Sequence, residues 1–232
     1  MEIPLVGMRW AGTDAFMNGE IQMPKQYRLN VSKINKSILW TPQKTGSIFN
    51  TQVFNFFDFY TDLIQYDLGL NDETIDFLYH GHSCYLFEGH QDYSLICSTR
   101  NPYSRLVSLF QHTKDYGQKE YQEGFKEFIN KLFPFEGTPY FHRGYHFKER
   151  VPDYFIRVES LFEDYGKIPF IKNSEFYKSG FLEHICSKKR NENLKITKNW
   201  REYYTDETAD IIYSSYQDYF NLLKYDRYSY KL

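Results

Sequence analysis

Short apolar runs alternate with polar, turn-forming stretches along this chain. The runs cover residues 37–41, 93–99 and 154–158, and each has the length of a buried strand. The first two lead directly into segments that are typical of helices. Strands that alternate with helices in this way predict an α/β domain with a central, mainly parallel sheet flanked by helices.

The last helix carries the clearest signals. Thr205 or Asp206 can cap its start, and the segment should end at residues 223–225. Apolar side chains recur on one face, namely Ala209, Ile212, Tyr213, Tyr216, Phe220 and Leu223. We expect this stripe to pack in the core. Another helix is expected around residues 121–132, whereas residues 1–30, with three glycines, predict an irregular N-terminal arm.

The first strand runs into a turn that suits a phosphate group. The sequence Lys44-Thr45-Gly46-Ser47 lies between the strand and a helix that opens near Ser47. A helix start presents unpaired N–H groups to an anion, and Gly46 lets the backbone approach it closely. Lys44 supplies a charge, and Thr45 and Ser47 supply hydroxyl donors. This is not a Walker A loop, because no glycine precedes the lysine in the required place. An ordinary turn with an exposed lysine is the alternative.

The second strand ends in a similar arrangement. Arg100 lies at its carboxyl end, Asn101 is a strong N-cap, and Pro102 suits the first helical position. Arg105 and Ser108 share one helix face, so Arg100 and Ser108 are candidates to meet one phosphate. Two anion turns in a small domain predict a ligand with anionic groups at both ends. Surface ion pairs are the alternative for both arginines.

A histidine pair lies between these turns. His80 and His82 flank Gly81, and imidazole is a suitable base for removing a hydroxyl proton near neutral pH. Two other interpretations remain. The histidines can lie at a strand edge without a catalytic role, or they can bind a metal with Cys84, for which no fourth ligand is evident.

Composition narrows the class of protein. A chain of 232 residues is long enough for one substantial core, and a formal net charge of -2 gives no sign of nucleic-acid binding. Three cysteines do not make a disulfide framework. No apolar stretch has the length of a membrane span. We therefore expect one domain over residues 1–232 and either a cytoplasmic protein, of microbial or viral type, or a chain from which a membrane anchor has been removed.

Together these motifs resemble the sulfotransferase superfamily. Lys44 to Ser47 is similar to the loop that binds the 5′-phosphosulfate of 3′-phosphoadenosine 5′-phosphosulfate, and Arg100 to Ser108 is similar to the 3′-phosphate motif. Residues 153–164 and 200–207 also resemble segments of that family, so the resemblance covers residues 37–225. Gln43 and Ile48 depart from its pattern. The sequence Tyr79-His-Gly-His82 resembles heparan sulfate 2-O-sulfotransferases.

The resemblance implies a P-loop-like sulfotransferase fold and transfer of a sulfuryl group to a hydroxyl, with a carbohydrate as the expected acceptor. It implies that Lys44, Thr45, Gly46 and Ser47 bind the 5′-phosphosulfate, that Arg100 and Ser108 bind the 3′-phosphate, and that His82 is the base with His80 in support. No metal is expected. A small-molecule kinase or nucleotidase, and a catalytically silent nucleotide- or glycan-binding protein, remain as alternatives.

Overall fold

The computed structural model describes residues 26–42, 44–65, 92–115, 124–133, 151–188 and 198–231. They form two compact units, and each unit is built from separate stretches of chain. The first unit holds the described residues within 26–99 and 151–188, and the second holds those within 100–133 and 198–231. The expected single domain over residues 1–232 is not tested by this grouping and stays a prediction.

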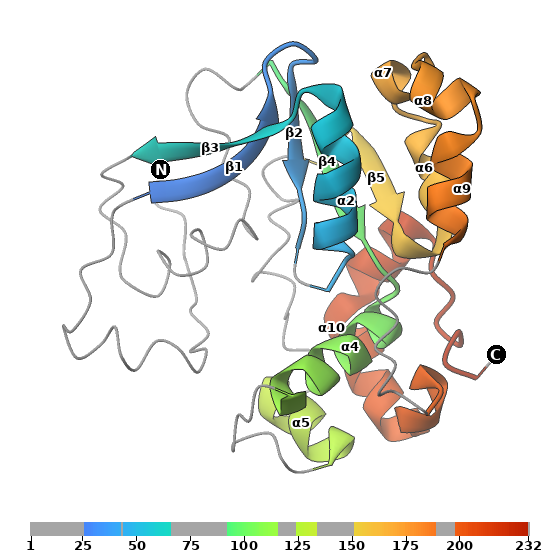
Figure 1. Ribbon diagram of the computed structural model, residues 1–232. Helices are drawn as coiled ribbons and strands as arrows, with labels where there is room; N and C mark the ends of the chain where they lie inside the picture. The colour runs from blue at the N-terminus through green and yellow to red at the C-terminus, as the bar shows by residue number, and fades with distance from the viewer. Residues whose placement is uncertain are drawn as a thin grey trace. The chain divides into compact units, whose positions relative to one another are not determined.

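A five-stranded sheet organises the first unit, in the order β3-β1-β2-β4-β5 (Figure 1). The strands are β1 (Gln26–Ser32), β2 (Ser37–Trp40), β3 (Tyr60–Gln65), β4 (Ser94–Thr99) and β5 (Tyr154–Arg157). β2, β4 and β5 pair in parallel, whereas β1 is antiparallel to both β2 and β3. Because β1 alone runs against the other strands, the predicted α/β fold with a mainly parallel sheet is confirmed.

The predicted irregular arm over residues 1–30 was wrong for residues 26–30, which belong to β1. Tyr27, Leu29 and Val31 alternate with polar residues, which is the two-residue period of a strand. The β1–β2 hairpin turns at residues 33–36, where Lys36 has a positive φ of 43°. The three glycines of the predicted arm all precede residue 26, so none of them lies in this strand.

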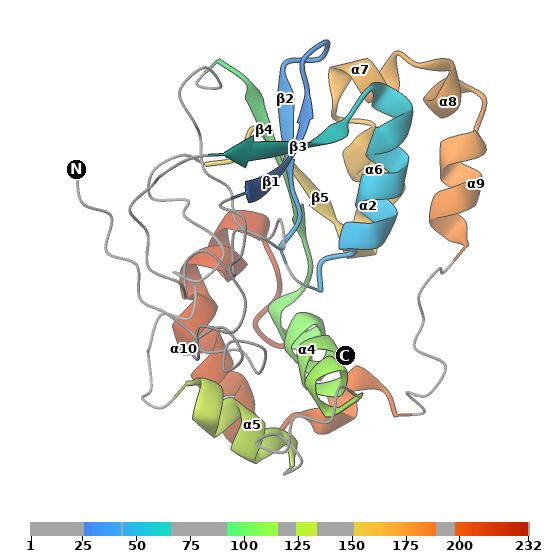
Figure 2. The ribbon, with the colours of Figure 1, turned by 60° about the vertical axis from the view of Figure 1, so that its left-hand side comes forward.

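The helices of the first unit lie on one face of its sheet (Figure 2). They are α2 (Ser47–Phe54), α6 (Leu161–Tyr165), α7 (Pro169–Lys172), α8 (Glu175–Lys178) and α9 (Phe181–Ser187), with single 3-10 turns η1 (Asn55–Phe57) and η4 (Val158–Ser160). Leu39, Ile96 and Ile156 come from the three parallel strands and are buried against this layer. Phe54 of α2 packs edge to face on Phe59, with ring centroids 4.8 Å apart. Burying one such side chain contributes about 1.5–3 kcal/mol.

The second unit is helical. It contains α4 (Pro102–Asp115), α5 (Phe125–Leu132), η5 (Trp200–Tyr203) and α10 (Asp206–Leu223). Thr205 is the N-cap of α10, since its hydroxyl accepts the Thr208 N–H at 3.3 Å. The predicted apolar stripe is confirmed as packing: Ala209, Ile212, Tyr216, Phe220 and Leu223 are buried, and Tyr213 is half-buried. The helix expected at residues 121–132 is described from Phe125 to Leu132.

Candidate functional site

The turn between β2 and α2 has an unusual backbone. Lys44 and Gly46 both have positive φ, 62° and 76°, on either side of Thr45. A non-glycine residue in this region is uncommon, and such strain is found preferentially at ligand-binding sites. A Cβ atom added at Gly46 would lie 3.4 Å from both Asn50 Nδ2 and Val158 Cγ2, in addition to the strain of its φ. The turn therefore needs glycine at this position.

The Thr45 side chain points into the protein. Thr45 is fully buried, and its hydroxyl donates to the Pro42 carbonyl at 2.5 Å. Its oxygen also lies 2.6 Å from the Ser98 hydroxyl of β4. Because the one Thr45 hydroxyl proton goes to Pro42, Ser98 is the donor in the second bond. The expected role of the Thr45 hydroxyl toward a phosphate is not tested, but in this conformation it joins the turn to β4.

Asn50, on the first full turn of α2, holds the carbonyl groups of the same turn. Its side-chain Nδ2 donates to the Thr45 carbonyl at 3.2 Å and to the Gly46 carbonyl at 3.0 Å. Its Oδ1 accepts a 2.6 Å hydrogen bond from the hydroxyl of buried Tyr165, at the end of α6. Burial raises the pKa of Tyr165 well above its ordinary value, so this hydroxyl keeps its proton.

The start of α2 leaves N–H groups directed away from Asn50. Gly46 is the N-cap residue, and no side chain caps the helix. In a trans peptide the C=O and N–H point in opposite directions, and no peptide bond in the described residues is cis. With the carbonyls of Thr45 and Gly46 on Asn50, the N–H groups of Gly46 and Ser47 face the other way. Ser47 is half-buried, and the Ile48 residue is 66 % exposed. This is the arrangement that an anion at a helix start requires.

The second predicted segment has the local structure that its sequence indicated. β4 ends at Thr99, so Arg100 follows the carboxyl end of a strand, and α4 begins at Pro102. Asn101 caps α4, since its Oδ1 accepts the Tyr103 N–H at 3.0 Å. The predicted cap and the predicted first helical residue are thus confirmed.

Arg100 lies along the start of α4. Its Nε donates to the Ser104 hydroxyl at 3.0 Å, and the hydroxyl of buried Tyr219 bonds both its N–H and its carbonyl, at 3.3 and 3.2 Å. Ser104 and Ser108 are four residues apart in one helix and share a face. Arg100, Ser104 and half-buried Ser108 therefore follow one another on one side of α4. The sequence placed Arg105 on the same face as Ser108. In the structure Arg105 is buried, and 9 % of its surface is exposed.

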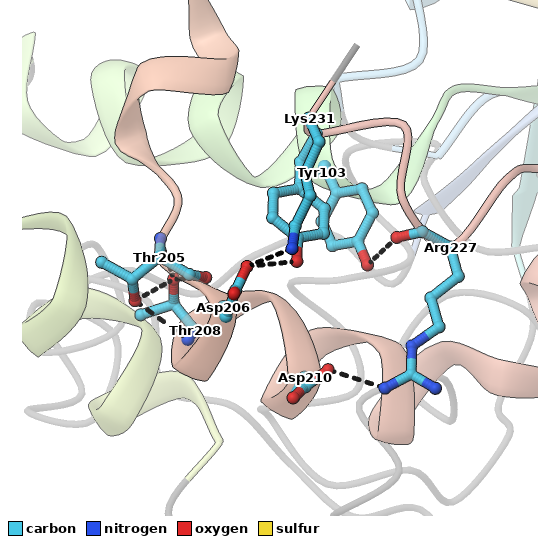
Figure 3. Close-up of polar contacts among 8 residues, drawn as sticks. Tyr103, Thr205, Asp206, Thr208, Asp210, Arg227 and Lys231 are labelled. Atoms are coloured by element: carbon cyan, nitrogen blue, oxygen red, sulfur yellow. Dashed lines mark hydrogen bonds and ion pairs between the residues drawn. The ribbon is translucent and has the colours of Figure 1, made fainter.

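The C-terminal segment supports this helix start (Figure 3). The Asn101 amide donates to the Ser229 hydroxyl at 2.9 Å, and the Tyr103 hydroxyl donates to the Arg227 carbonyl at 2.8 Å. Burial raises the pKa of Tyr103, so its hydroxyl stays a donor. Lys231 forms an ion pair with Asp206 at 2.8 Å. These bonds hold residues 227–231 against the start of α4 and the start of α10.

The strand β5 ends in a buried ion-pair network. Asp164 accepts the Arg157 backbone N–H at 2.9 Å and two guanidinium bonds from the same residue at 2.8 Å. Lys167 Nζ donates to the same carboxylate at 2.7 Å. Burial alone would raise the pKa of Asp164, but the bonds from Arg157 and Lys167 outweigh it and lower that pKa. The network stabilises the connection between β5 and α6. The last residue of α6 is Tyr165, which contacts Asn50.

Several predicted site residues lie outside the described residues. They are His80, His82 and Cys84, together with Gln43. The proposed base and the alternative metal site at this histidine pair therefore stay predictions. Among the residues that the structure does describe, no three His, Cys, Asp or Glu side chains gather as metal ligands, and none of the described helices is long and apolar enough to cross a membrane.

Sequence reasoning missed Asn50, Tyr165, Ser98 and Ser104. Asn50 carried a usable signal, because an asparagine four residues after Gly46 is placed to bond the turn's carbonyls. Tyr165 and Ser98 carried none, since their partners are 115 and 53 residues away.

Comparison with known proteins returned no matching family model, no matching curated protein and no matching solved structure.

Proposed function

We propose that this protein is a sulfotransferase with a P-loop-like sulfotransferase fold, which transfers a sulfuryl group from 3′-phosphoadenosine 5′-phosphosulfate to a hydroxyl on a carbohydrate. The observation that carries the proposal is the turn at Thr45 to Ser47. Its carbonyls are bonded to Asn50, and the uncapped start of α2 offers N–H groups to an anion.

Each predicted motif supports one end of the donor. The N–H groups of Gly46 and Ser47, the Ser47 hydroxyl and the Lys44 charge suit the 5′-phosphosulfate. Arg100 and Ser108 suit the 3′-phosphate, and Arg100 already forms a hydrogen bond with Ser104 on the same side of α4. A nucleotide that has both groups would be selected over one with a 5′-phosphate alone.

The proposed reaction is an in-line displacement at sulfur. The acceptor hydroxyl oxygen forms the new S–O bond as the bond between sulfur and the 5′-phosphate oxygen breaks, and His82 takes the hydroxyl proton. Lys44 neutralises the charge that develops on the leaving phosphate oxygen, and His80 contacts the acceptor. The products are a sulfate ester and adenosine 3′,5′-bisphosphate. As in phosphoryl transfer, positioning and charge stabilisation supply most of the rate.

Calorimetry with the unsubstituted chain tests this proposal. Adenosine 3′,5′-bisphosphate should bind far more tightly than 5′-AMP, and Arg100→Ala should lose about ten- to hundredfold of that preference, the usual loss for a charge-assisted hydrogen bond. Lys126→Ala is the matched control, because it removes one exposed charge that forms an ion pair with Glu207 on α10. It should leave the preference unchanged.

Two other results would favour the alternatives. Equal affinity for the two nucleotides would exclude the assignment, and tighter binding of ATP in the presence of magnesium would favour a kinase or nucleotidase. Tight bisphosphate binding without sulfate transfer to uronic-acid glycans, neutral sugars or phenols would favour a silent binding protein.

A further inference from the structure

We propose that Asn50, held by Tyr165, is the positioning residue that sets the anion-binding conformation of the turn. This inference rests on the proposed function and names a residue that the motif itself does not include. Asn50 bonds the carbonyl groups of Thr45 and Gly46, so it acts on a bound anion through the backbone.

The contacts of Asn50 determine which side of the turn carries N–H groups. The Gly46 carbonyl accepts two bonds from this one residue, from its backbone N–H at 2.9 Å and from Nδ2 at 3.0 Å. The Thr45 carbonyl accepts the other Nδ2 proton at 3.2 Å. Both peptide planes are thus fixed with oxygen toward Asn50 and N–H away from it. Rotation of either plane would break a bond to Asn50 and turn a carbonyl oxygen toward the anion.

Tyr165 fixes the amide itself. An asparagine amide can rotate by half a turn, and it would then direct Oδ1 toward the two carbonyls. The Tyr165 hydroxyl donates to Oδ1 at 2.6 Å, so the observed orientation satisfies both ends of the amide. Asn50 and Tyr165 are both fully buried, and no water is needed to explain their bonding.

Asn50→Asp separates this role from packing, because the side chain keeps its shape and its acceptor for Tyr165 but loses both donors. A carboxylate facing two carbonyl oxygens would displace them. Affinity for adenosine 3′,5′-bisphosphate and for 5′-AMP should fall about 10- to 100-fold, and Tyr165→Phe should lower both about threefold. The ratio of the two affinities should not change, because the turn binds the 5′ end that both nucleotides have.

Asn35→Asp is the matched control. Asn35 lies in the β1–β2 turn at the opposite end of β2, and its Nδ2 likewise donates to a backbone carbonyl, that of Phe57, at 2.8 Å. Both Asn→Asp variants should lower the midpoint of thermal unfolding, but Asn35→Asp should keep the wild-type nucleotide affinities.

The side-chain amide gives a readout that needs no ligand. In the wild type, the Asn50 Nδ2 protons should exchange with solvent far more slowly than those of exposed asparagines, and Tyr165→Phe should speed this exchange. Rapid exchange in the wild type would overturn the inference, even if Asn50→Asp fails to fold.

The binding outcomes distinguish the two proposals. Tight bisphosphate binding that Asn50→Asp weakens no more than Asn35→Asp does would overturn the role of Asn50 alone. Absence of binding by the wild type would overturn the proposed function, and the ligand role of the turn with it.

Discussion

Replacing Asp164 by asparagine should destabilise the first unit by about 3 kcal/mol near neutral pH. The Asp164 side chain is only 2 % exposed and accepts four hydrogen bonds from Arg157 and Lys167. Breaking a buried ion pair by removing one partner costs about 3–5 kcal/mol. The lower end applies here because the Arg157 and Lys167 side chains are 28 % and 53 % exposed, so that water can solvate their charges.

The same carboxylate makes this loss depend on pH. Its pKa is lowered in the folded protein, so the folded state favours the ionised form. The stabilisation is therefore present above the unfolded pKa, near 3.9, and is lost as the pH falls through the lower folded pKa. The wild type should lose its advantage over Asp164→Asn progressively from about pH 5 downward.

Urea unfolding, followed by far-UV circular dichroism from about pH 7 to about pH 3, measures both effects. Asp210→Asn is the control, because Asp210 forms an exposed ion pair with Arg227, and such pairs contribute about 0–1 kcal/mol. Hydrogen exchange of residues 154–165 should show the local loss. A difference between wild type and Asp164→Asn below about 1 kcal/mol at neutral pH, or one that stays constant down to about pH 3, would refute the reasoning.

Two predictions concern the proposed chemistry. Lys44→Ala should lower turnover more than nucleotide affinity, since only contacts that strengthen in the transition state raise the rate. If steady-state kinetics show weaker nucleotide binding with normal turnover at saturation, Lys44 contributes to binding alone. His82→Ala should lose about 10²–10⁴-fold in transfer of labelled sulfate while bisphosphate affinity by calorimetry stays near normal, and the acid limb of its pH–rate profile should vanish. His80→Ala should lower the transfer rate less than His82→Ala and should mainly raise the KM for the acceptor. Full activity of His82→Ala would contradict the role of His82 as the base.

Local sequence determined the elements whose signals lie within a few residues. The cap of α10 by Thr205 and the start of α4 at Asn101 and Pro102 were predicted, because a capping side chain bonds backbone groups two or three residues away. The short strands β2, β4 and β5 were predicted; β2 and β4 are buried, as their apolar runs indicated, whereas in β5 Ile156 is buried and its three neighbours in the strand are half-buried. Gly46 and Lys44 were recognised from their residue types, the glycine because it lets the backbone approach an anion and the lysine because of its charge, but the positive φ of Lys44 was not predicted.

Tertiary structure decided which groups of the turn are free to meet a ligand. The sequence offered the Thr45 hydroxyl as a donor, but Ser98, 53 residues away, and the Pro42 carbonyl engage it inside the protein. The sequence also gave no partner for Asn50, whose orientation depends on Tyr165, 115 residues away. The strand β1 was missed although its alternating pattern is local, and it pairs with β2 through a hairpin and with β3 on its other side. A hydrogen bond between distant segments leaves no periodicity in the sequence, so only the folded chain specifies it.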